Sequence, residues 1–278
     1  MTDPISPKFV DVQDEASDPS VLLEATPEGV AVLLLNRPTR KNAFNARMIV
    51  SLTEAFDTLA GAEGVRILFL RGAGGAFSAG ADLEWMRRAG TLSEAENRDD
   101  ALDLAKMLHA LRKLPMLTVA LVEGPAFGGG AGLVAACDMA VATADAQFSF
   151  SEVKLGLTPA TISPYVVEAI GARNARRLFA LGGRFGAGEA LRIGLVDRVV
   201  ASAEALDAAQ EALAEEIMAC APGAVADAKQ LADDVAGRTV DHALMEETAR
   251  RIAARRVSPE GREGLAAFFD KRKPAWMG

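Results

Sequence analysis

Apolar residues follow two different spacings along the first two hundred positions of the chain. Short uninterrupted apolar runs, each followed by turn residues, stand at 30–35, 67–70 and 117–122. Such runs are typical of strands buried on both faces. A helical spacing of apolar residues covers 46–60, and Ser93 with Glu96 predicts a capping box at the start of a further helix. Strands that alternate with helices predict the α/β class.

Strand patterns end near residue 200, and the remainder of the chain is predicted to be helical. Helical spacings stand at 205–219, 224–235, 244–255 and 259–271. Ser258 followed by Pro259 suits a helix start, with serine as the cap and proline in the first turn. We therefore expect a disordered or extended N-terminal segment over 1–20, a body over 21–200, and a helical region over 201–278.

Composition and charge narrow the classes of protein to which the chain can belong. Half of the 278 residues are hydrophobic and 24% are charged, which suits a protein with a large core. Acidic residues outnumber basic ones 38 to 30, and a net charge of −8 disfavours broad binding to nucleic acid or to anionic membranes. The acidic N-terminus resembles no export signal, and no apolar run reaches membrane-spanning length. We expect a soluble, cytoplasmic protein.

Few residues offer histidine or thiol chemistry. The chain has two cysteines, Cys137 and Cys220, and two histidines, His109 and His242, none of them at the spacing of a metal or redox motif. Both histidines lie in helical patterns, where a structural role is the simpler interpretation. We therefore expect neither a metal site nor a histidine-based triad.

Two glycine-rich segments, 72–82 and 124–133, directly follow apolar runs. Such loops expose backbone N–H groups, and two of them at one end of a sheet can face a single oxygen. Glycines also serve tight turns and close packing. Gly130, Gly132 and Ala135 fit a dinucleotide-binding pattern, but the distance from the preceding strand is too long for that motif.

A third feature is the stretch 148–159, in which Glu152 follows alternating aromatic and serine residues. Apolar surroundings raise the pKa of a carboxyl group and suit it to general acid/base catalysis near neutral pH. The alternative interpretation is a solvated glutamate or one paired with Lys154.

Several motifs together resemble the enoyl-CoA hydratase/isomerase (crotonase) family, from about residue 21 to the end. They are Leu-Asn-Arg-Pro at 35–38 with Asn-Ala-Phe at 42–44, Phe-Ser-Ala-Gly-Ala-Asp at 77–82, Gly-Gly-Gly at 128–130 ahead of Ala-Cys-Asp at 136–138, Ser-Glu at 151–152 with Leu-Gly at 155–156, Gly-Leu-Val at 194–196, and 268–274. The resemblance implies a spiral of repeated β-β-α units with a C-terminal helical trimerisation region. Trimers of this family usually pair into hexamers.

The resemblance also implies a site for an acyl-CoA thioester, in which coenzyme A is part of the substrate and no separate cofactor is needed. The thioester oxygen would lie between the backbone N–H groups of Ala81 and Gly129, with Glu152 as general acid/base. Residues implied in binding substrate or coenzyme A are Arg37, Arg40, Lys41, Ala79, Gly80, Asp82, Gly128, Gly132, Phe268 and Lys271. Each basic residue is also compatible with a solvated surface charge.

The sequence departs from the usual hydratase pattern at Gly132, where typical hydratases of the family have a second glutamate. Two chemistries stay open with Glu152 alone. One is hydration of a 2-enoyl-CoA, and the other is Δ3-to-Δ2 enoyl-CoA isomerisation. The number of carboxylates favours the isomerase. A wider resemblance, at 124–134 and 151–165, favours hydration, which is our prediction. Other crotonase reactions, such as decarboxylation or thioester hydrolysis, stay open.

The stretches 124–134 and 151–165 resemble hydratases of leucine and isoprenoid catabolism, which act on branched esters such as 3-methylglutaconyl-CoA. Ser163 and Pro164 would start the next helix. The distal carboxylate of such a substrate would need a partner, for which Thr161, Ser163 and Tyr165 are candidates. Some family members bind RNA, but the acidic composition disfavours that function here.

Overall fold

The apolar runs form the middle of a large sheet. The computed structural model describes residues 19–277, and within them six strands pair in the order β1-β2-β3-β4-β6-β9. They are β1 (Val21–Ala25), β2 (Val30–Leu35), β3 (Ile67–Gly72), β4 (Leu117–Val122), β6 (Met139–Thr143) and β9 (Arg198–Val200). Only the β1–β2 pair among these is antiparallel. The three predicted strands are confirmed as β2, β3 and β4.

A smaller sheet turns the chain into a spiral. Its strands are β5 (Pro125–Phe127), β7 (Gln147–Ser149) and β8 (Arg184–Gly186), in the order β5-β7-β8. Ser78 forms a parallel bridge with Ala126 of β5, so the turn that follows β3 joins the same small sheet. Each turn of the chain thus places one strand in the large sheet, one in the small sheet, and then a helix, which confirms the β-β-α spiral.

The helices begin and end close to the predicted positions. They are α1 (Ala46–Ala60), α2 (Leu83–Ala89), α3 (Glu94–Arg112), α4 (Gly129–Ala136), α5 (Ser163–Leu181), α6 (Ala187–Ile193), α7 (Ala203–Met218), α8 (Pro222–Val235), α9 (His242–Val257) and α10 (Pro259–Asp270). Ser93 and Glu96 form the predicted capping box of α3. Ser258 caps α10 by accepting the Gly261 N–H at 3.0 Å.

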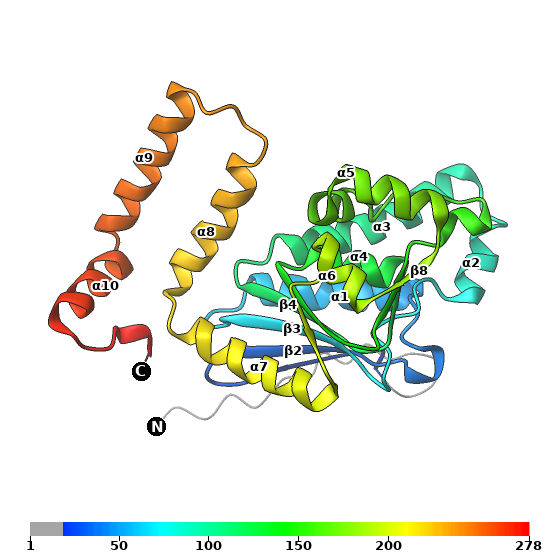
Figure 1. Cartoon of the computed structure of the whole chain (residues 1–278), viewed down its shortest axis with the longest axis horizontal. Helices are drawn as coiled ribbons and strands as arrows, with labels where there is room; N and C mark the ends of the chain where they lie inside the picture. The colour runs from blue at the N-terminus through cyan, green and yellow to red at the C-terminus, as the bar shows by residue number, and fades with distance from the viewer. Residues whose placement is uncertain (1–18, 278) are drawn as a thin grey trace.

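Alternating strand residues build two cores on opposite faces of the large sheet. One core faces α1, α3, α4 and α5 and contains Phe44, Phe56 and Phe77. On the other face, α7 buries Leu206, Leu213 and Ile217 against strand residues that include Ile67 and Phe69. Each such side chain contributes about 2 kcal/mol through burial. α7 is therefore part of the body, and the helices that stand away from it begin with α8 (Figure 1).

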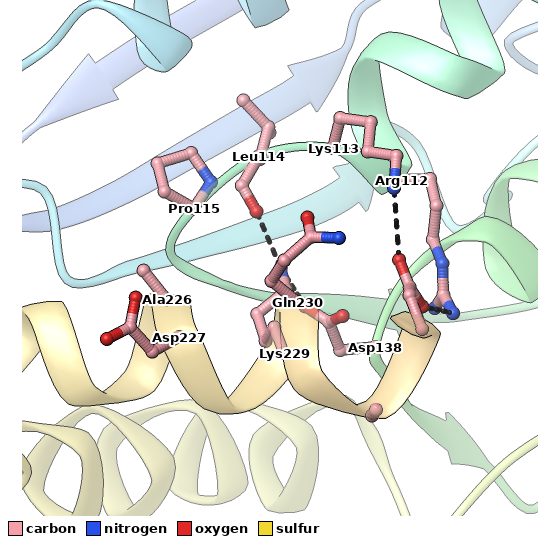
Figure 2. A pocket seen from close by; sticks show the side chains of 11 residues that line it. Arg112, Lys113, Leu114, Pro115, Asp138, Ala226, Asp227, Lys229 and Gln230 are labelled. Atoms are coloured by element: carbon pink, nitrogen blue, oxygen red, sulfur yellow. Dashed lines mark hydrogen bonds and ion pairs between the residues drawn. The ribbon is translucent and has the colours of Figure 1, made fainter. Parts of the chain in front are cut away.

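A cluster of charged groups docks α8 on the body (Figure 2). Lys229 Nζ lies 2.6 Å from a carboxylate oxygen of Asp138 and donates to the carbonyls of Leu114 and Met116 at 2.8 and 2.5 Å. Arg112 reaches Asp233 of the same helix at 2.6 Å. From this contact, α9 and α10 extend away from the sheets (Figure 1).

The predicted helical region has two parts in the structure. The helical region 201–278 consists of α7, which covers the sheet, and of the tail, α8 to α10. The predicted N-terminal segment, 1–20, lies almost entirely outside the described residues. No helix within 19–277 is both long and apolar enough to cross a membrane.

Candidate active site

Buried hydrogen bonds hold the first glycine-rich loop against the chain that precedes α1. Asn42 Nδ2 donates to the carbonyls of Ala73 and Ala76 at 2.9 and 2.6 Å, and its Oδ1 accepts the Arg37 N–H at 2.8 Å. Ser78 Oγ donates to the Asn42 carbonyl at 2.8 Å. Both side chains are buried, so the position of the loop depends on these uncharged bonds.

The two glycine-rich loops touch at positions that only glycine can fill. Gly80 has φ of +88°, and a Cβ there would lie 2.8 Å from the carbonyl oxygen of Phe127. Gly128, with φ of +49°, turns the chain from β5 into α4. The sequence therefore brings the backbone of residues 80–81 beside that of residues 127–129.

Each loop presents one backbone N–H outside the local hydrogen-bond pattern. Phe44 bridges the residues on either side of Ala81, accepting from Asp82 N at 2.8 Å and donating to the Gly80 carbonyl at 2.7 Å. The N–H of Ala81 consequently points away from that bridge. Gly129 opens α4, where first-turn N–H groups lack intrahelical partners. Both residues line one cavity.

Glu152 is the first residue of the short 3-10 helix Glu152–Leu155 and reaches into the same cavity. A Cβ at Gly128 would lie 3.2 Å from its Oε1, and its Oε2 is buried without a hydrogen-bond partner among the described residues. Burial raises the pKa of this carboxyl above its ordinary value, although a hydrogen bond from its own backbone opposes the shift. Within residues 19–277, Glu152 forms no ion pair with Lys154, which is exposed.

The cavity has a volume of about 140 Å³. Its walls are mainly apolar, with two threonines near Glu152. Besides Ala81, Gly129 and Glu152, it is lined by Phe44, Trp85, Leu104, Thr158, Pro159, Ala160, Thr161 and Ile162. Two oriented N–H donors and one uncompensated carboxyl group in an apolar cavity form a site that can stabilise an oxyanion and move a proton.

Comparison with known proteins agrees with this geometry. The family model described as enoyl-CoA hydratase/isomerase matches residues 25–278. The chain belongs to the enoyl-CoA hydratase/isomerase family. It is therefore an enzyme of the hydratase/isomerase superfamily.

Solved structures and curated relatives share most of the chain. An enoyl-CoA hydratase from Shewanella pealeana is 39% identical with a TM-score of 0.89, covering 92% of this chain and 96% of that one. AtuE of Pseudomonas aeruginosa is 40% identical with a TM-score of 0.88, covering 93% and 100%. An enoyl-CoA isomerase/hydratase of Mycosarcoma maydis is 35% identical over 260 residues, 90% of this chain and 93% of the relative.

Of the residues predicted to bind coenzyme A, Arg37 and Asp82 are engaged with each other. Their side chains are only 13% and 7% exposed and form an ion pair at 3.2 Å. Asp82 also caps α2 by accepting the Glu84 N–H at 2.9 Å. Burial opposes ionisation of Asp82, but hydrogen bonds from Glu84 and Arg37 hold its pKa below the usual value. The pair therefore fixes the loop that carries Ala81.

Arg40 and Lys41 lie on the exposed surface beside the loop. Arg40 is 3.5 Å from Glu84, and the Lys41 carbonyl accepts the Ala79 N–H at 2.8 Å. Phe268 and Lys271 stand at the end of α10, on the far side of the molecule from α2 (Figure 1). Within one chain the structure does not bring them to Glu152, and their predicted contact with coenzyme A stays a prediction about a neighbouring subunit.

The dinucleotide alternative is wrong, because β5 separates β4 from α4 and the glycines of α4 contact protein. A Cβ at Gly130 would lie 2.7 Å from the Cβ of Ser78. Burial raises the pKa of the Cys137 thiol strongly, which suits a structural residue. Within residues 19–277, no group of three or more histidine, cysteine, aspartate or glutamate side chains is arranged to hold a metal ion.

The sequence motifs did not predict three residues that line the cavity, Trp85, Leu104 and Ile162. Trp85 stands on α2 and donates from Nε1 to Asp100 of α3 at 3.1 Å, which fixes its ring. Leu104 appears in the sequence only as part of a helical apolar pattern, and Ile162 only as a neighbour of a predicted helix start. One available signal was Trp85 itself, since the chain has only two tryptophans.

Proposed function

We propose that the protein is an enoyl-CoA hydratase that adds water across the 2,3 double bond of a short, uncharged 2-enoyl-CoA. One observation carries this proposal. The buried carboxyl of Glu152, with its raised pKa and unpartnered oxygen, shares a cavity with the N–H groups of Ala81 and Gly129. This is the arrangement needed where an oxyanion develops beside a proton transfer.

The reaction follows from these three groups. The N–H groups of Ala81 and Gly129 hold the thioester oxygen and stabilise the enolate by a few kcal/mol each, about 3 kcal/mol per donor in comparable sites. Glu152 removes a proton from water as the water oxygen bonds to C3 and the double-bond electrons move to the thioester oxygen. The enolate then collapses as protonated Glu152 returns that proton to C2, so that one water molecule is added and Glu152 is regenerated.

Cavity size and polarity support a small acyl group. A volume of about 140 Å³ is close to that of an apolar protein cavity, about 150 Å³, that accommodates benzene. Within the described residues no lysine or arginine lines the cavity, so a carboxylate on the acyl group would find only the hydroxyls of Thr158 and Thr161. A crotonyl-sized chain fits this lining better than a dicarboxylic one.

The 3-methylglutaconyl ester is accordingly a secondary candidate. Of the three partners predicted for its distal carboxylate, Thr161 alone lines the cavity. Ser163 Oγ donates to the Ala160 carbonyl at 2.7 Å. Burial raises the pKa of the Tyr165 phenol, and its charged surroundings are Arg112 and Glu168, which do not line the cavity.

Isomerisation is the second candidate function, because Glu152 is the only carboxylate that lines the cavity among the described residues. A single carboxylate can remove a proton from C2 of a 3-enoyl-CoA and return it to C4. Supplying a 3-enoyl-CoA separates the two functions. Conjugated 2-enoyl-CoA that accumulates without a hydrated product indicates an isomerase.

The deciding experiment is an assay with crotonyl-CoA. Hydration removes the conjugation of the thioester, which absorbance measures, and mass spectrometry identifies the hydrated product. Glu152→Gln should lower kcat by about a thousandfold, since it removes the only proton carrier. Glu94→Gln, at an exposed position in the first turn of α3, is the matched control and should retain wild-type activity. Full activity of Glu152→Gln would refute the proposal.

We further propose that the protein acts in the cytoplasm as a homotrimer or a hexamer, and that Phe268 and Lys271 contact coenzyme A bound to a neighbouring subunit. The exposed side chain of Phe268 and its place on α10, which stands away from the sheets (Figure 1), support this proposal. Sedimentation should give a mass three or six times that of one chain. A monomer with full activity would contradict the proposed assembly. RNA binding at physiological salt without affinity for acyl-CoA would contradict the proposed enzyme function.

A further inference from the structure

One buried position packs against the cavity wall and has no room for a side chain. Gly132 lies in the first turns of α4, three residues after Gly129, and is buried. A Cβ at Gly132 would lie 2.3 Å from Cγ2 and 2.9 Å from Cβ of Ile162. Side chains in proteins do not approach this closely, so any residue larger than glycine requires Ile162 to move.

Ile162 is held where it is by its own local structure. Its side chain is only 3% exposed, and its carbonyl accepts the Val166 N–H at 3.2 Å in the first turn of α5. The preceding turn is fixed because the Ala160 carbonyl accepts both the N–H and the Oγ–H of Ser163, at 3.2 and 2.7 Å. A side chain branched at Cβ also has few rotamers into which it can withdraw.

Ile162 stands between position 132 and the cavity, because it lines the cavity and lies against Gly132. It lines the same cavity as Glu152 and Gly129. A carboxylate that projected from α4 at position 132 would have to pass through the volume that the Ile162 side chain fills. As an apolar part of the cavity wall, Ile162 contributes to the kind of surroundings in which burial raises the pKa of Glu152.

We propose that Ile162 is a specificity-determining residue that, by packing on Gly132, restricts proton transfer in this cavity to one carboxylate. This inference rests on the proposed hydration. Because Glu152 must both accept the proton of water and return it, the OH group and the proton add to the same face of the double bond. One titrating group then controls the rate, which rises as Glu152 ionises and stays level at higher pH.

The test is a cycle of three variants assayed with crotonyl-CoA as a function of pH. Gly132→Glu places a second carboxylate against Ile162, Ile162→Gly removes the obstruction, and the double variant has both changes. We expect Gly132→Glu to lower kcat/KM by about a hundredfold, and Ile162→Gly in that background to restore at least about tenfold. Glycine at position 162 suits the start of α5, where it precedes the first helical residue.

The pH profile gives a readout that a merely structural role would not move. The wild type and Ile162→Gly should show one rising limb. The double variant should show a bell, because two neighbouring carboxyl groups titrate as a pair and one of them acts as an acid. A bell for Gly132→Glu with Ile162 retained would overturn the proposal, as would a single limb for a double variant that still binds butyryl-CoA in calorimetry.

Denaturation with urea separates failure of this proposal from failure of the proposed function. Gly132→Ala should lower the midpoint concentration in the wild-type background and lower it far less in the Ile162→Gly background. Equal shifts in both backgrounds would show that Ile162 does not exclude a side chain at position 132. If the wild type hydrates no enoyl-CoA, the proposed function fails, while this cycle still decides whether Ile162 closes the position.

Discussion

The loops of the cavity and the helices of the tail are stabilised by different kinds of interaction. Around the cavity, the side chains of Asn42 and Ser78 are buried and make uncharged hydrogen bonds to backbone carbonyls. In the tail, few side chains are fully buried, and ion pairs form within the helices and between neighbouring segments. They include Arg251 with Asp234 and Glu247, Arg238 with Glu247, Arg255 with Asp227 and Glu260, and Arg272 with Glu263.

The two regions therefore respond to pH with opposite signs. Burial raises the pKa of Glu152, so ionisation of this group costs stability as pH rises through its folded-state pKa. Hydrogen bonds from Arg272 and from the Ala275 N–H lower the pKa of Glu263 to about 2, so its ionised form stabilises the fold. The fold thus disfavours the ionised form of Glu152 in the cavity and favours the ionised form of Glu263 in the tail.

The largest effect is expected from Asn42→Ala, which removes the side-chain hydrogen bonds that hold the first glycine-rich loop in place. The change strands the Arg37 N–H and the carbonyls of Ala73 and Ala76, and alanine is strained at the φ of +54° that Asn42 adopts. The free energy of unfolding should fall by about 3 kcal/mol. Hydration of crotonyl-CoA should be lost, because the loop carries Ala81. Urea denaturation and the absorbance assay measure the two effects.

Asn97→Ala is the matched control. Asn97 makes three side-chain bonds as well, since its Nδ2 donates to the carbonyls of Ala89, Leu92 and Ser93, but one of these contacts is exposed. Water can replace part of these bonds, so we expect a loss below about 1 kcal/mol and unchanged activity. Equal losses for the two variants would show that burial does not distinguish the cavity loop.

The next effect concerns the contact between the tail and the body, which Lys229→Met removes. The carbonyls of Leu114 and Met116 and the carboxylate of Asp138 lose the Lys229 ammonium. Among the described residues, that carboxylate then keeps only the N–H and Oγ–H of Thr118, both at 2.8 Å. We expect the free energy of unfolding to fall by about 2 kcal/mol, with faster hydrogen exchange confined to the tail. Lys113→Met is the control, since this lysine, 43% exposed, has a single ion pair at 3.2 Å with Asp233. Faster exchange in β3 and β4 would contradict the assignment of Lys229 to the tail contact.

The elements of the fold were predictable because their signals are local. An apolar run marks β4, and the bonds that Ser93 and Ser258 make as helix caps depend on residues within four positions. The position of Glu152 in apolar surroundings was also predictable from the phenylalanines that precede it. These features follow from short-range patterns and from a family's motifs.

Contacts between distant residues were not predictable from those patterns. The close approach of Ile162 to Gly132 joins two helices, and the ion pair of Arg37 with Asp82 joins residues 45 positions apart. A sequence shows an arginine near a motif but not whether an aspartate already neutralises it. The packing of α7 on the sheet likewise appears only when its apolar face meets Ile67 and Phe69.

A smaller effect is expected from Glu152→Gln on stability, apart from its effect on activity. The folded-state pKa of Glu152 is raised, so the native state binds more protons than the unfolded state between the two pKa values. Above the folded-state pKa the ionised carboxyl costs stability, and glutamine removes that cost. At pH 7 the variant should gain less than about 1 kcal/mol after allowance for solvent screening. Urea denaturation at pH 7 and at pH 4 measures it, and the gain should shrink at the lower pH.

The smallest effect is expected in the tail, where Glu263→Gln removes the carboxylate that Arg272 holds at 2.6 Å. The ionised form stabilises the fold above the ordinary pKa of 4.5, and that stabilisation is lost as pH falls toward a folded-state pKa of about 2. At pH 7 and low salt the thermal midpoint should drop slightly. The difference from the wild type should vanish near pH 2, and also in about 1 M salt, where charges are screened within about 3 Å.

Glu246→Gln controls for the loss of a surface carboxylate as such. Glu246 lies 3.3 Å from His242, and both side chains are exposed, so this surface pair contributes little to stability. Its thermal midpoint should therefore not depend on salt more than that of the wild type. A salt-independent loss for Glu263→Gln would mean that packing rather than charge joins Arg272 to α10, and the contrast between the tail and the cavity would then rest on burial alone.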